Sequence, residues 1–168
     1  MRALVLVALA GCSIADFDID QSVPEQRVPG SPIPGPLQAL FPLPIDLDLS
    51  AKIKEQTTGP IGSVSLSSLE LTITPTAMTG GDKDDWGFVQ EIHVFVKSSQ
   101  SGSSLPRAEI AHVTSPGAVT TMTFVVETKV NLDPYVNEGS VIETTGSGTA
   151  PSDDVTYDGK AVFTVHPL

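Results

Sequence analysis

The chain has 168 residues, with 9 Lys and Arg against 20 Asp and Glu, which gives a formal net charge of −11 at pH 7. An acidic balance of this size argues against nucleic acid as a partner and against docking onto anionic lipid headgroups. The length suits one domain that buries enough surface to need no disulfide, and the chain has only one cysteine.

The chain opens with a short apolar run, Ala3–Ala10, which follows Arg2 directly. This run is too short to cross a bilayer, which takes roughly 20 apolar residues. The tetrapeptide Leu9-Ala10-Gly11-Cys12 looks like a bacterial lipobox. We therefore predict a lipoprotein signal peptide over residues 1–11, cleaved before Cys12, and lipidation of Cys12. The alternative is a core strand at an ordinary N-terminus, with Cys12 as a buried apolar thiol.

The lipobox also predicts where the protein is held. A single acyl chain binds membranes only marginally, whereas two or more anchor stably. In lipoproteins of the enteric type, an Asp after the lipidated cysteine favours the inner membrane, so Ser13 favours the outer membrane. Removal of residues 1–11 leaves 8 basic against 20 acidic residues, a net charge of −12. An acylated Cys12 has no thiol left for metal ligation, disulfides or nucleophilic attack.

Downstream of Cys12 the chain is rich in Val, Ile, Thr and Ser and holds 14 Gly and 14 Pro. That composition is typical of all-β proteins. We expect an antiparallel β-sandwich of seven or eight strands with one short helical turn near residues 133–138. The expected organisation is a tether and possible first strand at 12–22, a Pro-rich crossover or stalk at 23–44, and the sandwich domain at 45–168.

Seven of the fourteen prolines lie between Pro24 and Pro44. Because proline lacks an N–H donor, this segment is predicted to be neither a central strand nor a long helix. A single helical turn is expected at Leu37–Phe41. The apolar residues of the segment need cover, either by packing over the sandwich or by docking another envelope protein; they are Val28, Ile33, Leu37, Leu40, Phe41 and Leu43.

Alternating apolar and polar residues then predict a series of strands. Ile45–Ile53 is expected to be the first of them. In the next, a change of phase at Ser67-Ser68 predicts a β-bulge, since one extra residue moves every later side chain to the other face. Further strands are expected at Phe88–Lys97, Arg107–Val113, Val119–Glu127, Val141–Thr145 and Val155–Val165.

Two local motifs near the C-terminus predict a helical turn and an irregular strand. Asp133 is expected to cap a helical turn that has Pro134 at its first position and ends at Gly139. Asp158-Gly159 is a strong hairpin signal, but one continuous strand keeps all the apolar residues of this stretch on one face. We therefore expect Gly159 to mark a bulge or a close approach between strands.

The loop Gly80–Gly87 offers the best candidates for chemistry. Asp82, Asp84 and Asp85 are hard oxygen ligands of the kind that Ca²⁺ prefers, although their spacing does not fit an EF-hand. A solvated turn is the alternative. Trp86 is expected either to stack on a sugar ring or to pack over the end of the core.

Other catalytic patterns are missing from the sequence. The three histidines, His93, His112 and His166, have no zinc-protease spacing. Alternation places His93 outward beside Glu91, and His112 on the face of Ile110. No G-x-S-x-G motif and no phosphate-binding loop occurs. We therefore expect a protein that is not an enzyme; an enzyme would need His93, His112 and carboxylates to converge in a pocket.

Four segments in order carry a resemblance to a known group of proteins: 85–96, 105–111, 131–136 and 154–157. From the first to the last they span about half of the chain, and their order is similar to that in small exported bacterial β-sandwich proteins. The resemblance implies the same fold. No catalytic or binding residues are established for that group, so none are carried over.

Together these patterns predict a lipid-anchored envelope lipoprotein that acts as a non-enzymatic binding or structural module. Its expected partners are the membrane, through the lipid anchor, and another envelope protein. The alternative function is a calcium-dependent carbohydrate-binding domain that uses the loop at 82–86.

Overall fold

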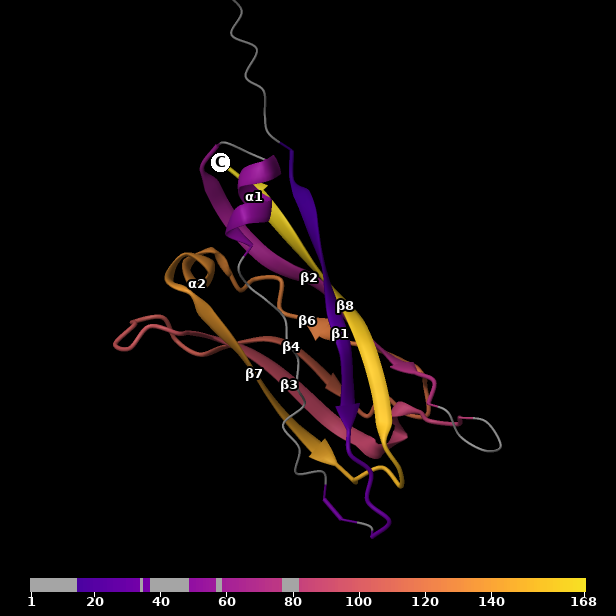
Figure 1. The fold of residues 1–168 in the computed structure, drawn as a ribbon. Helices are drawn as coiled ribbons and strands as arrows, with labels where there is room; N and C mark the ends of the chain where they lie inside the picture. The colour runs from indigo at the N-terminus through magenta and orange to yellow at the C-terminus, as the bar shows by residue number, and fades with distance from the viewer. Residues whose placement is uncertain (1–14, 34, 37–48, 57–58, 77–81) are drawn as a thin grey trace, which may run out of the picture.

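The computed structural model describes residues 15–33, 35–36, 49–56, 59–76 and 82–168. Within this part of the chain, eight strands form two antiparallel four-stranded sheets that pack as a sandwich, as predicted (Figure 1). The first sheet has the order β1-β8-β2-β5 and the second the order β6-β4-β3-β7. The strands are β1 (Phe17–Val28), β2 (Ile61–Thr74), β3 (Val89–Ser98), β4 (Ala108–Thr114), β5 (Thr121–Thr123), β6 (Val125–Val126), β7 (Ser140–Gly148) and β8 (Val155–Pro167).

The described residues also form three short helical segments. These are α1 (Ser50–Gln56), the 3-10 turn η1 (Trp86–Phe88) and α2 (Asp133–Glu138). Gly139 ends α2 with a φ of 84°, as expected, but the residue before the helix is Leu132, so Asp133 lies inside the helix and does not cap it. No described helix has the length and apolar character to span a bilayer.

Strand β8 is continuous and lies between β1 and β2, which confirms that Asp158-Gly159 is not a hairpin turn. Its alternate residues Val155, Tyr157, Ala161, Phe163 and Val165 are all buried. A Cβ on Gly159 would lie 2.5 Å from both the Glu70 carbonyl oxygen and Leu71 Cδ2. The predicted close approach between strands is therefore present, and it explains why this position has no side chain.

Two bulges set which side chains face the core. The register of β2 shifts between Leu66 and Ser68, as the change of phase predicted. In β4, Ala111 pairs with Val94 and Glu109 with Phe95, so Ile110 is the extra residue. Ile110 and Ala111 are both buried. The alternation that placed His112 on the face of Ile110 is wrong, because this bulge turns His112 outward.

The first strand is longer than expected. β1 continues through Val28, past residue 22, and Pro24 falls where the pairing with β8 shifts between Val23 and Gln26. An edge strand tolerates proline at a bulge because no ladder hydrogen bond is lost there. Val28 is buried as the last residue of β1.

After β1, the described part of the Pro-rich segment packs on the connection between β7 and β8. Ser31 N–H donates to the Pro151 carbonyl (2.8 Å), and Ala150 N–H donates to the Gly35 carbonyl (2.9 Å). Ile33 is 75% exposed. The expected turn at Leu37–Phe41 and the apolar residues Leu37, Leu40, Phe41 and Leu43 lie outside the described residues.

The expected strand Ile45–Ile53 is wrong over its last part, because Ser50–Gln56 is the helix α1. Residues 45–48 lie outside the described part. Leu49 and Ile53 are both buried, and a spacing of four places two residues on one face of a helix as well as on one face of a strand. The intervening Ala and Lys residues favour the helix.

The sequence predicts one strand over Val119–Glu127, but the segment forms two short strands, one in each sheet. β5 pairs with β2 and β6 pairs with β4. Phe124 lies between these two strands, is buried, and donates its N–H to the Leu69 carbonyl (3.0 Å). The chain thus crosses from one sheet to the other inside this segment.

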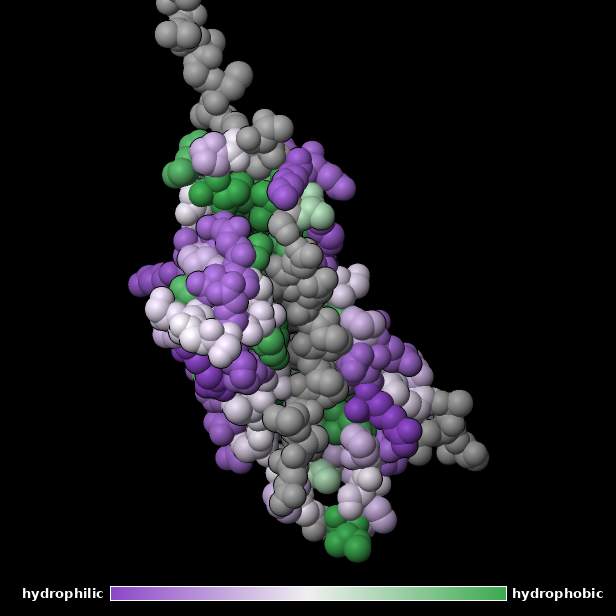
Figure 2. Space-filling model, turned by 60° about the vertical axis from the view of Figure 1, so that its left-hand side comes forward, coloured by the Kyte–Doolittle hydropathy of each residue, from purple (hydrophilic) through white to green (hydrophobic). Residues whose placement is uncertain are grey.

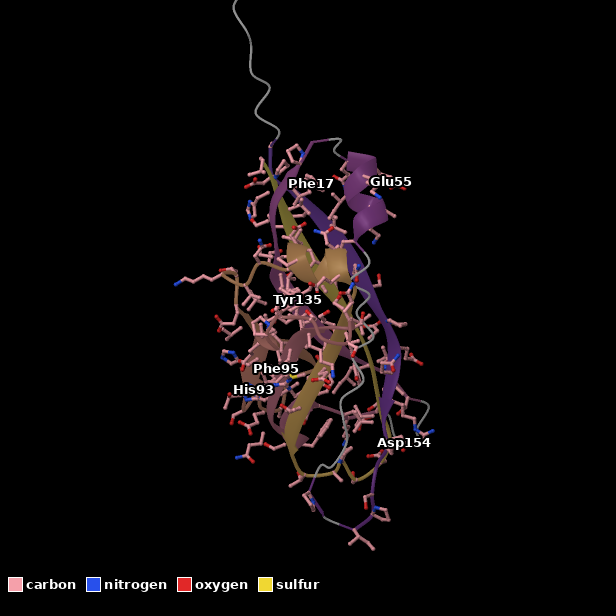
Figure 3. All side chains as sticks on the ribbon, turned by 90° about the vertical axis from the view of Figure 1, so that its left-hand side faces the viewer. Phe17, Glu55, His93, Phe95, Tyr135 and Asp154 are labelled. Carbon is pink, nitrogen blue, oxygen red and sulfur yellow. The ribbon has the colours of Figure 1, made fainter. Side chains whose placement is uncertain are left out.

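The two ends of the sandwich differ. Phe17 and Glu55 lie at one end, and Asp154 lies at the other (Figure 3). We call the end that carries α1 and the start of β1 the α1 end. The opposite end, where β1 finishes and β8 begins, is called the far end.

Candidate functional site

The outer face of the second sheet brings together two histidines that are distant in sequence. His93 on β3 lies directly opposite His112 on β4. Their ring centroids are 5.9 Å apart, with an interplanar angle of 26°. The two side chains are 32% and 31% exposed. Opposed residues on antiparallel strands share one face, so the bulge at Ile110 is what makes this pair.

One carboxylate faces both imidazoles. Glu109 Oε2 lies 3.2 Å from His93 Nδ1, and Glu109 Oε1 lies 3.0 Å from His112 Nδ1. Two further carboxylates lie at the rim: Glu91 Oε2 is 3.6 Å from His93 Nε2, and Glu127 Oε1 is 3.9 Å from His112 Nδ1. We call these five residues the His–Glu cluster.

The two Nδ1 atoms are shielded from solvent. Neither makes a hydrogen bond of good geometry with any described residue, although each lies close to a Glu109 oxygen. A polar nitrogen that is removed from water without a well-aligned partner raises the free energy of the folded state. The His–Glu cluster is therefore the least satisfied polar region of this face.

Cations lie beside the cluster but are engaged elsewhere. The Arg107 guanidinium lies 3.3 Å from the centroid of the Phe95 ring, and Phe95 in turn lies next to His93 (Figure 3). Arg107 Nε donates to Glu143 Oε2 (3.0 Å), and Lys97 also pairs with Glu143. Hydrogen bonds from Lys97 and then Arg107 hold the pKa of Glu143 below its usual value.

At the far end, two of the three expected calcium ligands hold the loop in shape. Asp82 Oδ2 accepts hydrogen bonds from the N–H and the hydroxyl of Thr76, and its Oδ1 accepts one from Asp84 N–H (2.8 Å). The backbone bond from Thr76 and then that from Asp84 hold the pKa of Asp82 below its usual value. Asp85 Oδ1 accepts from Gly87 N–H (2.8 Å) and so caps η1.

Asp84 has a different environment. Its Oδ2 is shielded from solvent and has no hydrogen-bond partner among the described residues. Burial, followed by the charges of Asp82 and Asp153, raises the pKa of Asp84 to about 6. The described residues contain no group of three or more His, Cys, Asp or Glu side chains already placed to hold a metal ion. Calcium binding by Asp82, Asp84 and Asp85 stays a prediction.

Trp86 is fully buried. Its ring lies 5.7 Å from Phe88 and 5.4 Å from Tyr157, and its Nε1 donates to the Thr120 carbonyl (3.2 Å). The expectation that Trp86 stacks on a sugar is wrong, because its indole has no face open to a ligand. The packing alternative is confirmed.

The far end also carries two open clefts. One, of about 370 Å³, is lined by Arg27, Thr76, Asp153, Asp154 and Thr156. In it, Arg27 pairs with Asp154, which also accepts from Gly30 N–H (3.0 Å). The second, of about 340 Å³, is lined by residues 87–90 at the start of β3, by Ser115 and Gly117 after β4, and by Gly148 and Thr149 at the end of β7. Neither cleft is lined by His93 or His112, so the convergence that an enzyme would need does not occur in these clefts.

Sequence reasoning missed the meeting of His93 and His112. The sequence does carry a signal for the outward orientation of His112, namely two consecutive apolar residues, Ile110-Ala111, where strict alternation allows only one. Read as a bulge, that pair turns His112 outward. Cys12 lies outside the described residues.

Comparisons with known proteins place the chain in no family. No family model matches it, and no curated protein matches it. One similar solved structure is a chain from turnip yellow mosaic virus, which is 15% identical, with a TM-score of 0.30 over 100% of this chain and 89% of that chain. A likeness at that TM-score carries no inference about fold or function.

Proposed function

We propose that the protein is a lipid-anchored lipoprotein of the bacterial envelope, whose β-sandwich serves as a non-enzymatic binding or structural module. The observation that carries this proposal is the position of the lipobox. Cys12 precedes the first residue of β1, Phe17, by five positions. A fully extended chain of that length spans at most about 18 Å. An anchor on Cys12 would therefore hold the α1 end close to the bilayer.

The surface of the α1 end is compatible with that orientation. Apolar side chains gather there (Figure 2), and Leu168, whose N–H donates to the Pro60 carbonyl (3.0 Å), is 82% exposed at this end. The far end, with its acidic loop and clefts, would then point away from the membrane. Ser13 favours the outer membrane as the site of anchoring.

The anchoring proposal is tested with Cys12→Ser. We expect the wild-type chain to sediment with membranes and to incorporate labelled palmitate, and the variant to do neither. Ser13→Asp is the matched control: it keeps the lipid and should shift the protein from outer to inner membrane fractions. Equal membrane association of Cys12→Ser and wild type would refute the proposal.

Orientation is tested with single introduced cysteines, which an acylated Cys12 makes unique thiols. Glu55→Cys labels the α1 end and Ile33→Cys labels the far end; both positions are exposed. With a fluorophore on each, spin-labelled lipid should quench the label at position 55 more strongly than the label at position 33. Stronger quenching at position 33 would contradict the proposed orientation.

The alternative, a calcium-dependent carbohydrate-binding domain, has lost its stacking residue because Trp86 is buried. Its remaining part is calcium binding by the acidic loop. A calcium titration followed by the unfolding temperature tests it: no shift at millimolar calcium would count against it.

A further inference from the structure

We propose that His93, His112 and Glu109 form a binding site for a divalent transition-metal ion of the Zn²⁺ type. The site is independent of the lipid anchor and of the acidic loop, and it lies on the outer face of the second sheet. Two imidazoles and one carboxylate, with a position open to water, are a donor set that zinc takes in proteins.

The two distances from the carboxylate to the imidazoles fit such a site, although the described side chains are not yet placed to hold an ion. Bonds of 2.0–2.1 Å in a tetrahedral zinc site place neighbouring ligand atoms about 3.3 Å apart. The Glu109 oxygens lie 3.2 Å from His93 Nδ1 and 3.0 Å from His112 Nδ1. Each imidazole is thus at ligand-to-ligand distance from the shared carboxylate. The 5.9 Å between ring centroids means that the rings must turn toward each other to meet one ion.

The strand pairing keeps the two histidines opposite each other, so only their side chains need to rotate. β3 and β4 are the two inner strands of their sheet, and His112 is paired on one side with His93 and on the other with Val125. Opposed residues on antiparallel strands have Cβ atoms about 5 Å apart. Because both imidazoles are partly exposed, their rotation needs no change in the core.

Local electrostatics favour a cation at this position. Three carboxylates surround the two imidazoles, and the nearby Arg107 and Lys97 are engaged by Glu143. An ion would also give the two shielded Nδ1 atoms a well-aligned partner, whereas the Glu109 oxygens lie close to them without making a hydrogen bond of good geometry.

Glu91 lies beside the proposed site, just beyond hydrogen-bond distance of His93. Its Oε2 lies 3.6 Å from His93 Nε2, the ring nitrogen that stays free when Nδ1 binds a metal, and its Oε1 accepts a hydrogen bond from Ser147 (3.2 Å). A carboxylate on the free ring nitrogen is the usual way in which proteins orient a metal-binding histidine. Imidazole ligands select zinc, nickel and copper over calcium and magnesium, which prefer oxygen ligands alone.

The test uses the full chain with Cys12→Ser, which removes the thiol as a competing ligand. Calorimetric titration with Zn²⁺ should show one ion bound per chain. His93→Asn and His112→Asn should each weaken binding by more than about tenfold, and Glu91→Gln by about tenfold. The matched control is His166→Asn. His166 also faces a carboxylate, with Nδ1 2.9 Å from Asp16 Oδ2, but it lies on the other sheet, so binding should be unchanged.

A second measurement needs no histidine variant. Added Zn²⁺ should shift the imidazole NMR signals of His93 and His112 and leave those of His166 in place. Co²⁺ should give the visible absorption of a four-coordinate site. Absence of saturable Zn²⁺ binding, equal weakening by His166→Asn, or unperturbed His93 and His112 signals would each overturn the proposal. Unchanged Ca²⁺ behaviour in His93→Asn separates this site from the acidic loop.

Discussion

The outer faces of the two sheets have the same strand geometry, but their polar residues are paired differently. On the first sheet, polar residues pair locally: Thr164 Oγ1 donates to Asp18 (2.7 Å), Lys160 pairs with Asp20 (2.7 Å), and His166 faces Asp16. On the second sheet, three carboxylates converge on two imidazoles. A face whose polar groups are paired contributes to solubility and to cross-strand stability. A ligand gains more binding free energy on a face whose polar groups lack well-aligned partners.

One bulged residue on β4 contributes to that difference. In the first sheet, β8 keeps its alternation from end to end, and its Thr164 and Lys160 contact Asp18 and Asp20 of β1. In the second sheet, the extra residue Ile110 changes the phase of β4. That change exposes His112 instead of burying it. The bulge at Ile110 therefore puts His112 on the same outer face as His93, where the candidate binding site lies.

The largest expected effect removes the core that both faces share. Trp86→Ala should lower the free energy of unfolding by about 3–5 kcal/mol, because it empties a fully buried site against Phe88 and Tyr157. Chemical denaturation measures the loss. Trp86→Phe keeps most of the contact and should cost clearly less; equal losses would show that the indole is not packed as described.

The next effect should be confined to the first sheet. Gly159→Ala puts a Cβ 2.5 Å from the Glu70 carbonyl oxygen and Leu71 Cδ2. Overpacking of this kind costs about 1–3 kcal/mol, and hydrogen exchange should quicken in β2 and β8 more than in β3. Gly35→Ala, where the nearest atom lies 3.9 Å away, is the control and should change stability little. A neutral Gly159→Ala would contradict the close approach.

A smaller effect depends on pH. The pKa of Asp84 is raised from 3.8 to about 6, chiefly by burial, so the folded state holds this proton more tightly than the unfolded state. The contribution of Asp84 to stability is therefore present at low pH and declines as the pH rises from 3.8 through about 6. Asp84→Asn should be more stable than wild type at pH 7.5 and gain less at pH 4, as measured by denaturation midpoints.

The control for that pH effect is Asp158→Asn, at an exposed position of β8. It removes the same charge from the protein and should leave the decline between pH 4 and 7.5 in place. If Asp158→Asn flattened the decline as much as Asp84→Asn, the cause would be overall charge and not the environment of Asp84.

The smallest expected effect lies on the second sheet. With chelator present, His93→Asn and His112→Asn should each change the free energy of unfolding by less than about 1 kcal/mol, since partly exposed ion pairs contribute little. Thermal denaturation in EDTA checks this. A loss of several kcal/mol would mean that the cluster stabilises the fold and would remove the contrast between the two faces.

Features that depend on neighbouring residues could be predicted from the sequence, whereas features that depend on distant residues could not. The alternation in β2, β3 and β8 and the bulge at Ser67-Ser68 are period-two patterns that core burial enforces, and they were predicted correctly. Alternation between Leu49 and Ile53 did not distinguish a strand from a helix. The prolines exclude a central strand, and the possible first strand was placed at 12–22; that β1 continues past Pro24 depends on its place at the sheet edge, which is a property of the topology. The pairing of His93 with His112 depends on register between strands, which one chain segment does not encode by itself.

The course of β1 has a mechanical consequence. This strand begins at Phe17 at the α1 end and runs along β8 to the far end, where Arg27 pairs with Asp154. A pull between a lipid on Cys12 and a partner held at the far end would act parallel to these two strands. The hydrogen bonds of the β1–β8 ladder would then bear the load together in shear and would not be peeled apart one after another. Among the described strands, β1 is the longest edge strand, and under the proposed anchoring it would carry the load along the length of the sandwich.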